Sequence, residues 1–311
     1  MLAKSYYHLK GLIPRSIQIK LRQILVRYQR VTCQDIWPID PSTTNLQPPW
    51  DHWPDHKRFA LVLTHDVETD TGLQRCPLLM KMEQELGFRS SFNFVPERYT
   101  TPSKIRQRIK SEGFEVGVHG LLHDGKLYNS KKIFMKRAAR INEYIKAWDA
   151  VGFRSPSMHH NLEWLKELNI LYDASTFDTD PFEPDNRGVG TIFPFWVPHP
   201  SGQGGFVELP YTLAQDSMLF LLLKEKTVDI WKKKLDWIAE QGGMALINTH
   251  PDYMNFSSAP CSINEYPSDL YRQFLDYVAT KYPDQYYHPL PHEIAIFTTE
   301  QYRQSINRMT P

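Results

Sequence analysis

Two short segments of the sequence combine side chains that bind metal ions with side chains that transfer protons. In the first, LVLTHDVETD, an apolar run is followed by His65 and two carboxylates, Asp66 and Glu68. The second, HGLLH, places His119 and His123 four residues apart. Histidines at this spacing lie on one face of a helical turn and can share one metal ion. The two segments are therefore candidates for two parts of one metal site.

A catalytic zinc ion usually has about three protein ligands and a water molecule, so two histidines need one carboxylate partner. Asp66 and Glu68 are two residues apart, and such residues point the same way in an extended segment. One carboxylate can bind the ion while the other accepts a proton from water. For each motif alone a structural explanation is also open: a polar strand end for the carboxylates, and a loop with ordinary hydrogen bonds for the histidines.

Three further candidates lie at or near the ends of later predicted strands. Arg154, in RSPS, would lower the pKa of a neighbouring carboxylate and fix its orientation, or would be a surface cation at a turn. Asp173 lies in YDASTF. His250, in INTHPDY, is the only histidine at the end of the last predicted strand, which makes it the natural general acid.

The elements that must position these side chains alternate between strand and helix patterns after residue 57. We predict strands at 59–63, 91–95, 114–118, 151–154, 170–174, 205–209 and 244–248, and helices at 73–86, 103–111, 130–150, 162–168, 227–241 and 268–281. This alternation implies parallel strands joined by helices, either in an open sheet or in an irregular barrel. In both architectures functional side chains gather at the carboxyl ends of the strands, where these candidates lie.

Composition restricts the class of protein. The chain of 311 residues is 41% hydrophobic and 23% charged, as expected for a globular protein, and its net charge of +1 gives no reason to propose a nucleic-acid partner. Three distant cysteines offer no disulfide framework. We find neither a signal-peptide pattern nor an apolar stretch long enough to span a bilayer, and we expect a cytoplasmic protein.

The first 34 residues contain seven Lys and Arg and no acidic residue. Ile17, Leu21, Ile24 and Leu25 recur there at helical spacing, which predicts a basic amphipathic helix. Such a helix docks on its own domain with its charged face in water, or residues 1–30 make peripheral contact with the inner face of a membrane. We therefore divide the chain into a basic helix with a Pro- and Trp-rich connector, 1–57, and a catalytic domain, 58–311.

In chain order, the segments THDVE, HGLLH, RSPS, YDASTF and LINTH resemble the motifs of the polysaccharide deacetylase family, the NodB-like carbohydrate esterases of family four. The resemblance spans residues 58–255. It implies an α/β fold, a distorted (β/α) barrel of about seven strands, here with an N-terminal helical extension. It also implies a divalent metal cofactor, usually Zn²⁺, and hydrolysis of an N-acetyl group, or an O-acetyl group, on a sugar, glycan or glycan precursor.

The resemblance also implies a role for each candidate residue. Asp66 would be the catalytic base, and Arg154 would pair with it. His250 would be the general acid, and Asp173 would be a supporting acidic residue. The metal ligands would be Glu68, His119 and His123.

The sequence departs from the family pattern at several positions. Val67 separates the two carboxylates, Gly120 replaces a Ser or Thr in the histidine loop, and Phe177 stands where Trp is usual. Ser157 replaces a Tyr, but its backbone N–H can still contact the oxyanion. His65 takes the place of an aromatic residue, and we expect it to form a wall of the site.

Sugar binding uses aromatic faces near the strand ends, so Trp196 and Tyr211 join Ser157 as candidate substrate-binding residues. Packing in the core or in a lid is the alternative role for the two aromatic residues. We expect the loop 178–205 to form a lid over the substrate. Without an export signal, an intracellular glycan precursor is favoured as the substrate. Two other functions stay open: hydrolysis of small cyclic or N-acyl amides on the same fold, and carbohydrate binding without catalysis.

Overall fold

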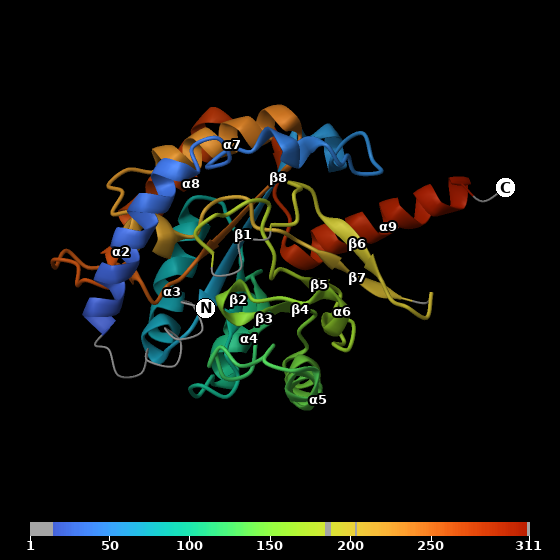
Figure 1. The fold of residues 1–311 in the computed structure, drawn as a ribbon, viewed down its shortest axis with the longest axis horizontal. Coiled ribbons are helices and arrows are strands. Elements are labelled where there is room, and N and C mark those ends of the chain that lie inside the picture. The colour runs from blue at the N-terminus through green and yellow to red at the C-terminus, as the bar shows by residue number, and fades with distance from the viewer. Residues whose placement is uncertain (1–14, 184–187, 203, 310–311) are drawn as a thin grey trace.

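A computed structural model describes residues 15–183, 188–202 and 204–309, and its central feature is one strongly curved β-sheet (Figure 1). Within these ranges seven parallel strands lie at the predicted positions: β1 (Phe59–Val67), β2 (Ser91–Phe94), β3 (Glu115–His119), β4 (Gly152–Arg154), β5 (Tyr172–Asp173), β7 (Gly205–Glu208) and β8 (Met244–Thr249). Their spatial order is β8-β1-β2-β3-β4-β5-β7. The predicted α/β barrel of about seven strands is confirmed.

The barrel is incomplete between β7 and β8. The segment that follows β7 crosses this gap, where Leu213 forms a single parallel bridge with Ile247 of β8. At the edges of the sheet, β6 (Phe195–Pro198) pairs antiparallel with β7, and β11 (Tyr286–Tyr287) pairs with the start of β1. We predicted neither these strands nor the pair β9 (Met254–Asn255) and β10 (Tyr266–Pro267), because strands of two to four residues carry too little hydrophobic periodicity.

Helices surround the sheet, as expected for β/α units. The six predicted helices are α3 (Asp70–Glu85), α4 (Ser103–Ser111), α5 (Lys131–Trp148), α6 (Leu162–Leu165), α7 (Asp229–Gln241) and α8 (Asp269–Lys281). We did not predict α9 (Pro291–Met309), which extends away from the barrel in Figure 1. Short helical segments are η2 (Pro41–Thr44), η3 (Pro54–His56), η4 (Pro156–Met158) and the π-helix η5 (Ser217–Leu222). The predicted lid, 178–205, contains β6, and residues 184–187 and 203 lie outside the described residues.

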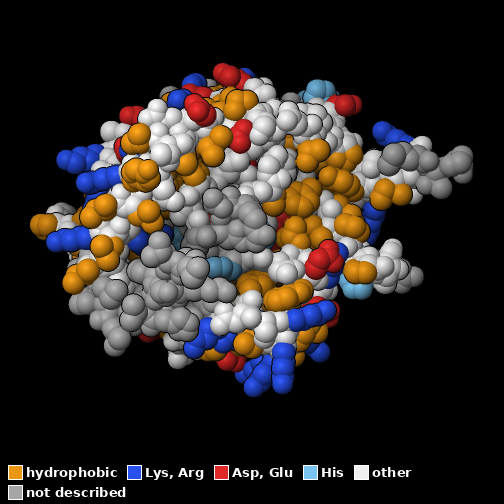
Figure 2. All heavy atoms as spheres, in the orientation of Figure 1, with side chains coloured by type: hydrophobic (Ala, Val, Ile, Leu, Met, Phe, Trp, Pro, Cys, Tyr) orange, Lys and Arg blue, Asp and Glu red, His pale blue; other side chains and the backbone are white. Residues whose placement is uncertain are grey.

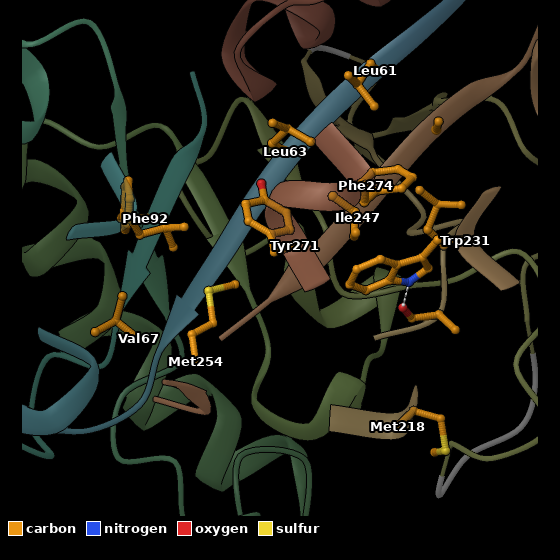
Figure 3. Close-up of a cluster of buried hydrophobic side chains, with 14 of the residues drawn as sticks. Leu61, Leu63, Val67, Phe92, Met218, Trp231, Ile247, Met254, Tyr271 and Phe274 are labelled. Atoms are coloured by element: carbon orange, nitrogen blue, oxygen red, sulfur yellow. Dashed lines mark hydrogen bonds between the residues drawn. The ribbon is translucent and has the colours of Figure 1, made fainter. Parts of the chain in front are cut away.

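The main hydrophobic core lies between the sheet and the helices (Figure 3). Leu61 and Leu63 of β1 belong to it, together with Trp231 of α7 and Phe274 of α8. The indole N–H of Trp231 donates to the carbonyl oxygen of Ala214 at 2.7 Å, so this polar atom is satisfied although the side chain is fully buried.

Alternation along β1 decides which of its polar residues reach the inside of the barrel. Ala60 and Val62 belong to a second buried cluster, which fills the barrel interior, whereas Leu61 and Leu63 lie in the outer core. Successive residues of a strand point to opposite faces. His65 therefore continues the outer row of β1, and Asp66 continues the inner row.

The predicted N-terminal helix is α2 (Arg15–Thr32), and it packs against η5. The amide of Gln23 donates to the carbonyl oxygen of Leu221 at 2.8 Å, and the side chains of Ile19 and Val26 are buried. The four apolar residues whose spacing predicted the helix are instead exposed on the other side of it: Ile17, Leu21, Ile24 and Leu25. The helix therefore docks on its own domain with Lys20, Arg22 and Arg27 exposed, as expected, but its main apolar stripe is exposed as well. No helix in the described ranges is both long and apolar enough to cross a bilayer.

Candidate active site

Asp66 lies at the centre of a buried hydrogen-bond network at the end of β1. Its Oδ1 accepts from Nδ2 of Asn93 at 3.0 Å, and its Oδ2 accepts from Nδ2 of Asn248 at 2.9 Å. Nη1 of Arg154 lies 3.4 Å from Oδ1. Burial by itself would raise the pKa of Asp66, but electrostatic attraction to the neighbouring His119 and Arg154 lowers this pKa to about 2. The carboxylate is therefore ionised and held in one orientation.

No sequence motif singled out Asn93 and Asn248, although both lie near the ends of strands that pair with β1. Asn93 is in register with Asp66 on β2, and Gly117 of β3 leaves room for its side chain: a Cβ at Gly117 would lie 2.1 Å from Oδ1 of Asn93. Asn248 accepts a hydrogen bond from Nη1 of Arg154 while it donates to Asp66. It therefore joins the base to the arginine.

Arg154 is completely buried, which rules out the surface cation that was its structural alternative. Its Nε donates to the carbonyl oxygen of Ala174 at 2.7 Å, and its Nη1 donates to Oγ1 of Thr64 at 2.8 Å. These bonds fix the guanidinium plane beside Asp66. A buried positive charge in this position stabilises the ionised carboxylate.

His119 and His123 approach each other through a loop, and the helical turn that their spacing suggested is wrong. His119 ends β3, and Gly120 and His123 have left-handed backbone angles, with φ of 62° and 53°. A Cβ on Gly120 would lie 2.5 Å from the ring of Pro156, so the Ser or Thr of the family pattern would not fit here. The loop brings the two imidazole centroids to 5.1 Å.

The hydrogen bond of His119 determines which of its ring nitrogens faces the site. Nδ1 lies 3.1 Å from the carbonyl oxygen of Arg154, which can only accept, so Nδ1 carries the proton. Nε2 then offers its lone pair and lies 3.8 Å from Oδ2 of Asp66. Burial lowers the pKa of His119 to about 4, which keeps the imidazole neutral, as a metal ligand must be.

Glu68 is positioned by the segment that follows β8. Its backbone N–H donates to Oδ2 of Asp252 at 2.8 Å, and the hydroxyl of Tyr253 donates to its Oε2 at 3.0 Å. Its Oε1 lies 3.0 Å from Nε2 of His123. Burial opposes ionisation, but electrostatic attraction to the neighbouring His123 holds the pKa of Glu68 well below the usual range.

Glu68, His119 and His123 form a group whose ligand atoms all lie within 4.8 Å of one another. Nε2 of His123 is buried and has no hydrogen-bond partner within the described part of the chain, because Glu68 is close to it but not aligned as an acceptor. Two imidazole nitrogens and one carboxylate oxygen are a common ligand set for catalytic zinc. These residues therefore fit a divalent metal ion.

His250 lies on the other side of Glu68, with its Nε2 3.9 Å from Oε1. Its Nδ1 is 2.7 Å from Oδ1 of Asp216, and its backbone N–H donates to Oδ2 of the same carboxylate at 2.8 Å. Tyr266 also donates to this Oδ2, at 2.9 Å. Burial lowers the pKa of His250, but the charge and hydrogen bond of Asp216 raise it to about 10. The ring is therefore a proton donor at neutral pH.

Asp173, which the resemblance assigned as the supporting acidic residue, occupies a different position. Its carboxylate accepts from the backbone N–H and hydroxyl of Ser175 at 3.0 and 2.7 Å, and burial raises its pKa. No hydrogen bond or ion pair between described residues joins it to Asp66 or His250. Asp173 therefore makes no direct contact with the base or the acid, and its supporting role stays a prediction; Asp216 is the acidic residue that contacts His250.

The three predicted substrate-binding residues have unlike surroundings. Ser157 is exposed, with φ of 57°, and directly follows Pro156. Tyr211 is buried, and its hydroxyl donates to Asp180 at 2.8 Å. Trp196 lies on the edge strand β6 and packs over Gly205. Ser157 alone of the three is exposed, and the surroundings of the two aromatic residues indicate structural roles.

His65 points away from these groups, as the alternation along β1 requires. Its Nδ1 is 2.7 Å from Oγ1 of Thr249, and its Nε2 is 2.9 Å from Oε1 of Glu83 in α3. The ring is fully buried. The expectation that His65 forms a wall of the site is wrong, and its role is to link β1, β8 and α3.

The fold and the site together define an incomplete α/β barrel with a group at its strand ends that could hold a metal ion. Neither a family model nor a curated protein matches the sequence. Among solved structures, one assigned as a polysaccharide deacetylase from Mycobacterium smegmatis is 20% identical, with a TM-score of 0.64 over 82% of this chain and 95% of that one. One with the same assignment from Pseudomonas aeruginosa PAO1 is 15% identical, with a TM-score of 0.61 over 83% and 95%.

The allantoinase PuuE is also similar, with 17% identity and a TM-score of 0.60 over 83% of this chain and 96% of that one. The chain therefore has the NodB-like fold found in proteins assigned as polysaccharide deacetylases, and this confirms the fold that its motifs led us to expect. The same fold in an allantoinase means that the fold by itself does not select the substrate.

Proposed function

We propose that the protein is a metal-dependent hydrolase that removes an acetyl group from the nitrogen, or from an oxygen, of a sugar, glycan or glycan precursor. One observation carries the proposal: the group Glu68, His119 and His123, which could hold a metal ion, lies between the carboxylate of Asp66 and the imidazole of His250. Hydrolysis of an amide needs a base for water, charge stabilisation at the carbonyl and an acid for the leaving nitrogen. The choice of an acetylated sugar is supported by the motifs and by the assignments of two proteins with this fold.

Glu68, His119 and His123 would hold the metal ion, for which we propose Zn²⁺. When bound, the ion would supply a Lewis acid that polarises the carbonyl group and lowers the pKa of water.

Asp66 is the base in this proposal. It stays ionised at every working pH because its pKa is about 2, and it accepts the proton of the water that attacks the carbonyl carbon. Asn93, Asn248 and Arg154 hold the carboxylate in place, so little reorganisation is needed during the reaction.

His250 is the general acid. An amide nitrogen is a poor leaving group until it is protonated, and the imidazolium can supply this proton from Nε2 because Nδ1 is bound to Asp216. We propose the backbone N–H of Ser157 as an oxyanion donor, because the turn at Ser157 follows Pro156, which packs against the histidine loop.

The test combines metal analysis with acetate release from a panel of N-acetylated and O-acetylated sugars and oligosaccharides. We expect bound metal, loss of activity with a chelator and recovery with Zn²⁺. Asp66→Asn should abolish turnover and keep the metal, whereas Glu68→Gln should lose the metal. Asp149→Asn, which changes an exposed carboxylate, is the matched control and should behave as wild type. An active Asp66→Asn enzyme would overturn the assignment of the base.

A second candidate is hydrolysis of a cyclic or N-acyl amide, which the similarity to an allantoinase keeps open. The same panel separates the two functions when ring amides are added, because ring opening releases no acetate. If the protein binds no metal and hydrolyses no member of the panel, a carbohydrate-binding protein without activity becomes the better description.

A further inference from the structure

Helix α2 presents its larger apolar side away from the protein. Six large apolar side chains on this side are 48 to 71% exposed: Ile17, Leu21, Ile24, Leu25, Tyr28 and Val31. Their spacing of mostly three and four residues places them in one stripe along the helix. On the opposite side, Ile19 and Val26 are buried against the domain. In most surface helices the wider apolar face is the buried one, so α2 is oriented the other way round.

The exposed stripe is not required to hold α2 on the domain. Polar contacts on the inner side do so: Gln23 donates to the carbonyl oxygen of Leu221 at 2.8 Å, and Gln29 donates to that of Pro181 at 3.2 Å. Arg30 adds an ion pair with Glu225. A contiguous apolar stripe on a protein surface usually marks an interaction site.

The charges around the stripe indicate the chemistry of its partner. Lys20 and Arg27 lie along its border, and residues 1–34 contain no acidic side chain. Figure 2 shows hydrophobic and basic side chains intermingled at the edge of the molecule where Figure 1 places α2. An apolar face bordered by Lys and Arg is the pattern of a helix that lies in the interface of an anionic bilayer.

We propose that α2 docks the protein on an anionic membrane surface, with its apolar stripe among the lipid acyl chains and its basic residues at the headgroups. This inference does not depend on the proposed catalytic function. A second copy of the chain is a poorer partner, because a symmetric contact between two α2 helices would bring like charges together.

The test is sedimentation of the full chain with vesicles. One set contains phosphatidylcholine alone, and the other contains phosphatidylcholine with about one third phosphatidylglycerol. We expect binding to the anionic vesicles that is at least tenfold stronger than to the neutral ones and that weakens as salt increases.

Two double variants test the two parts of the surface. Ile24→Ser with Tyr28→Ser removes apolar area, and Lys20→Gln with Arg27→Gln removes charge. Each should weaken binding roughly tenfold or more, and both should keep the wild-type melting temperature because these side chains are exposed. Leu46→Ser with Ile296→Ser is the matched control, since it changes two exposed apolar side chains outside α2, and should bind as wild type.

Each result decides the proposal. Equal binding to both vesicle types, or unchanged binding by the variants of α2, overturns it. Absence of vesicle binding also overturns it, and if Ile24→Ser with Tyr28→Ser then converts a dimer into a monomer, the stripe is an interface between copies of this chain.

Discussion

Replacing Asp216 by Asn tests whether the charge behind His250 makes this histidine the proton donor. Asn keeps the size of the side chain and removes its negative charge. In the native protein, burial lowers the pKa of His250, but the charge and hydrogen bond of Asp216 raise it from 6.5 to about 10. A rise of this size favours the protonated ring by ~5 kcal/mol. Without the charge of Asp216, the effect of burial dominates, and the ring becomes neutral at pH 7.

The assay is the pH dependence of kcat/KM. A reaction that needs protonated His250 loses activity as the pH rises through the pKa of this residue. In the native enzyme this alkaline limb should lie well above pH 7, and below pH 10, because a cation held by Glu68 repels the imidazolium. In Asp216→Asn the limb should move below pH 7, and activity at pH 8 should fall by roughly 10² to 10⁴. The metal content should not change, because Asp216 is outside the ligand group.

Two variants control for structural damage. Tyr266→Phe removes one hydrogen bond to Asp216 but keeps its charge, so the alkaline limb should move only slightly. Asp173→Asn makes the same chemical change in a buried carboxylate that does not touch His250, and its limb should stay at the native position. An Asp216→Asn enzyme with the native pH profile would refute either the role of His250 as the acid or the role of Asp216 in setting its pKa.

Three further outcomes follow from the geometry. Gly120→Ala should destabilise the protein by about 2 kcal/mol or more and weaken metal binding, because the added Cβ meets Pro156. Gly125→Ala, at a similar positive φ but without such a contact, should destabilise the protein by about 1 kcal/mol. Denaturant titration measures the stability of each variant, and metal titration measures its metal affinity. Because the pKa of Asp66 is lowered, its ionised form contributes ~2 kcal/mol to the free energy of unfolding above pH 4, and this contribution is lost as the pH falls toward 2. In acid unfolding, Asp66→Asn should therefore lose less stability than the native protein over this pH range. Asn248→Ala should lower kcat more than it raises KM, because it removes a hydrogen bond that orients Asp66 and leaves the metal ligands in place. A change in KM alone would contradict the role of Asn248 in positioning the base.

The fold, and the part of the site at the ends of β1 and β3, could be predicted from sequence periodicity and strand order. Strand alternation places Asp66 and His65 on opposite sides of β1, and the ends of parallel strands bring β1 and β3 side chains to the same rim. His119, His123 and one of the two carboxylates Asp66 and Glu68 could therefore be proposed as ligands from spacing and strand position, and the resemblance to the family then selected Glu68. The conformation of the histidine loop could not, because it depends on the contact between Gly120 and Pro156, which are distant in sequence.

Asp216 could not be found in this way, because its segment carries no motif. The closure of the barrel places it: Leu213 bridges to Ile247 in parallel, and three residues further along both segments Asp216 meets His250. The register of a strand pair across an incomplete barrel is a tertiary property. Sequence patterns therefore selected Asp173, which lies on a strand with a recognisable motif.

The orientation of α2 was also out of reach, and for a different reason. Hydrophobic periodicity predicts the apolar stripe of a helix but not which side meets the protein. Here the inner side is fixed by hydrogen bonds from Gln23 and Gln29 to backbone carbonyl groups of distant segments. Many kinds of side chain can donate a hydrogen bond to a backbone carbonyl group, so such contacts produce no recognisable sequence pattern.

The π-helix η5 contacts both α2 and the carboxylate that holds His250, so the docking of α2 should influence the general acid. Asp216 caps the π-helix η5, where its Oδ1 accepts from the N–H of Ser217 at 2.7 Å, and α2 binds the other end of η5 through Gln23. Releasing α2 should therefore loosen the carboxylate that holds His250. Gln23→Ala with Val26→Ser should lower kcat on a soluble substrate several-fold and move the alkaline limb toward acid pH. The outer variant, Ile24→Ser with Tyr28→Ser, leaves the contact with η5 intact and should keep the native kcat. If the inner variant keeps both the native kcat and the native pH profile, η5 holds Asp216 without help from α2.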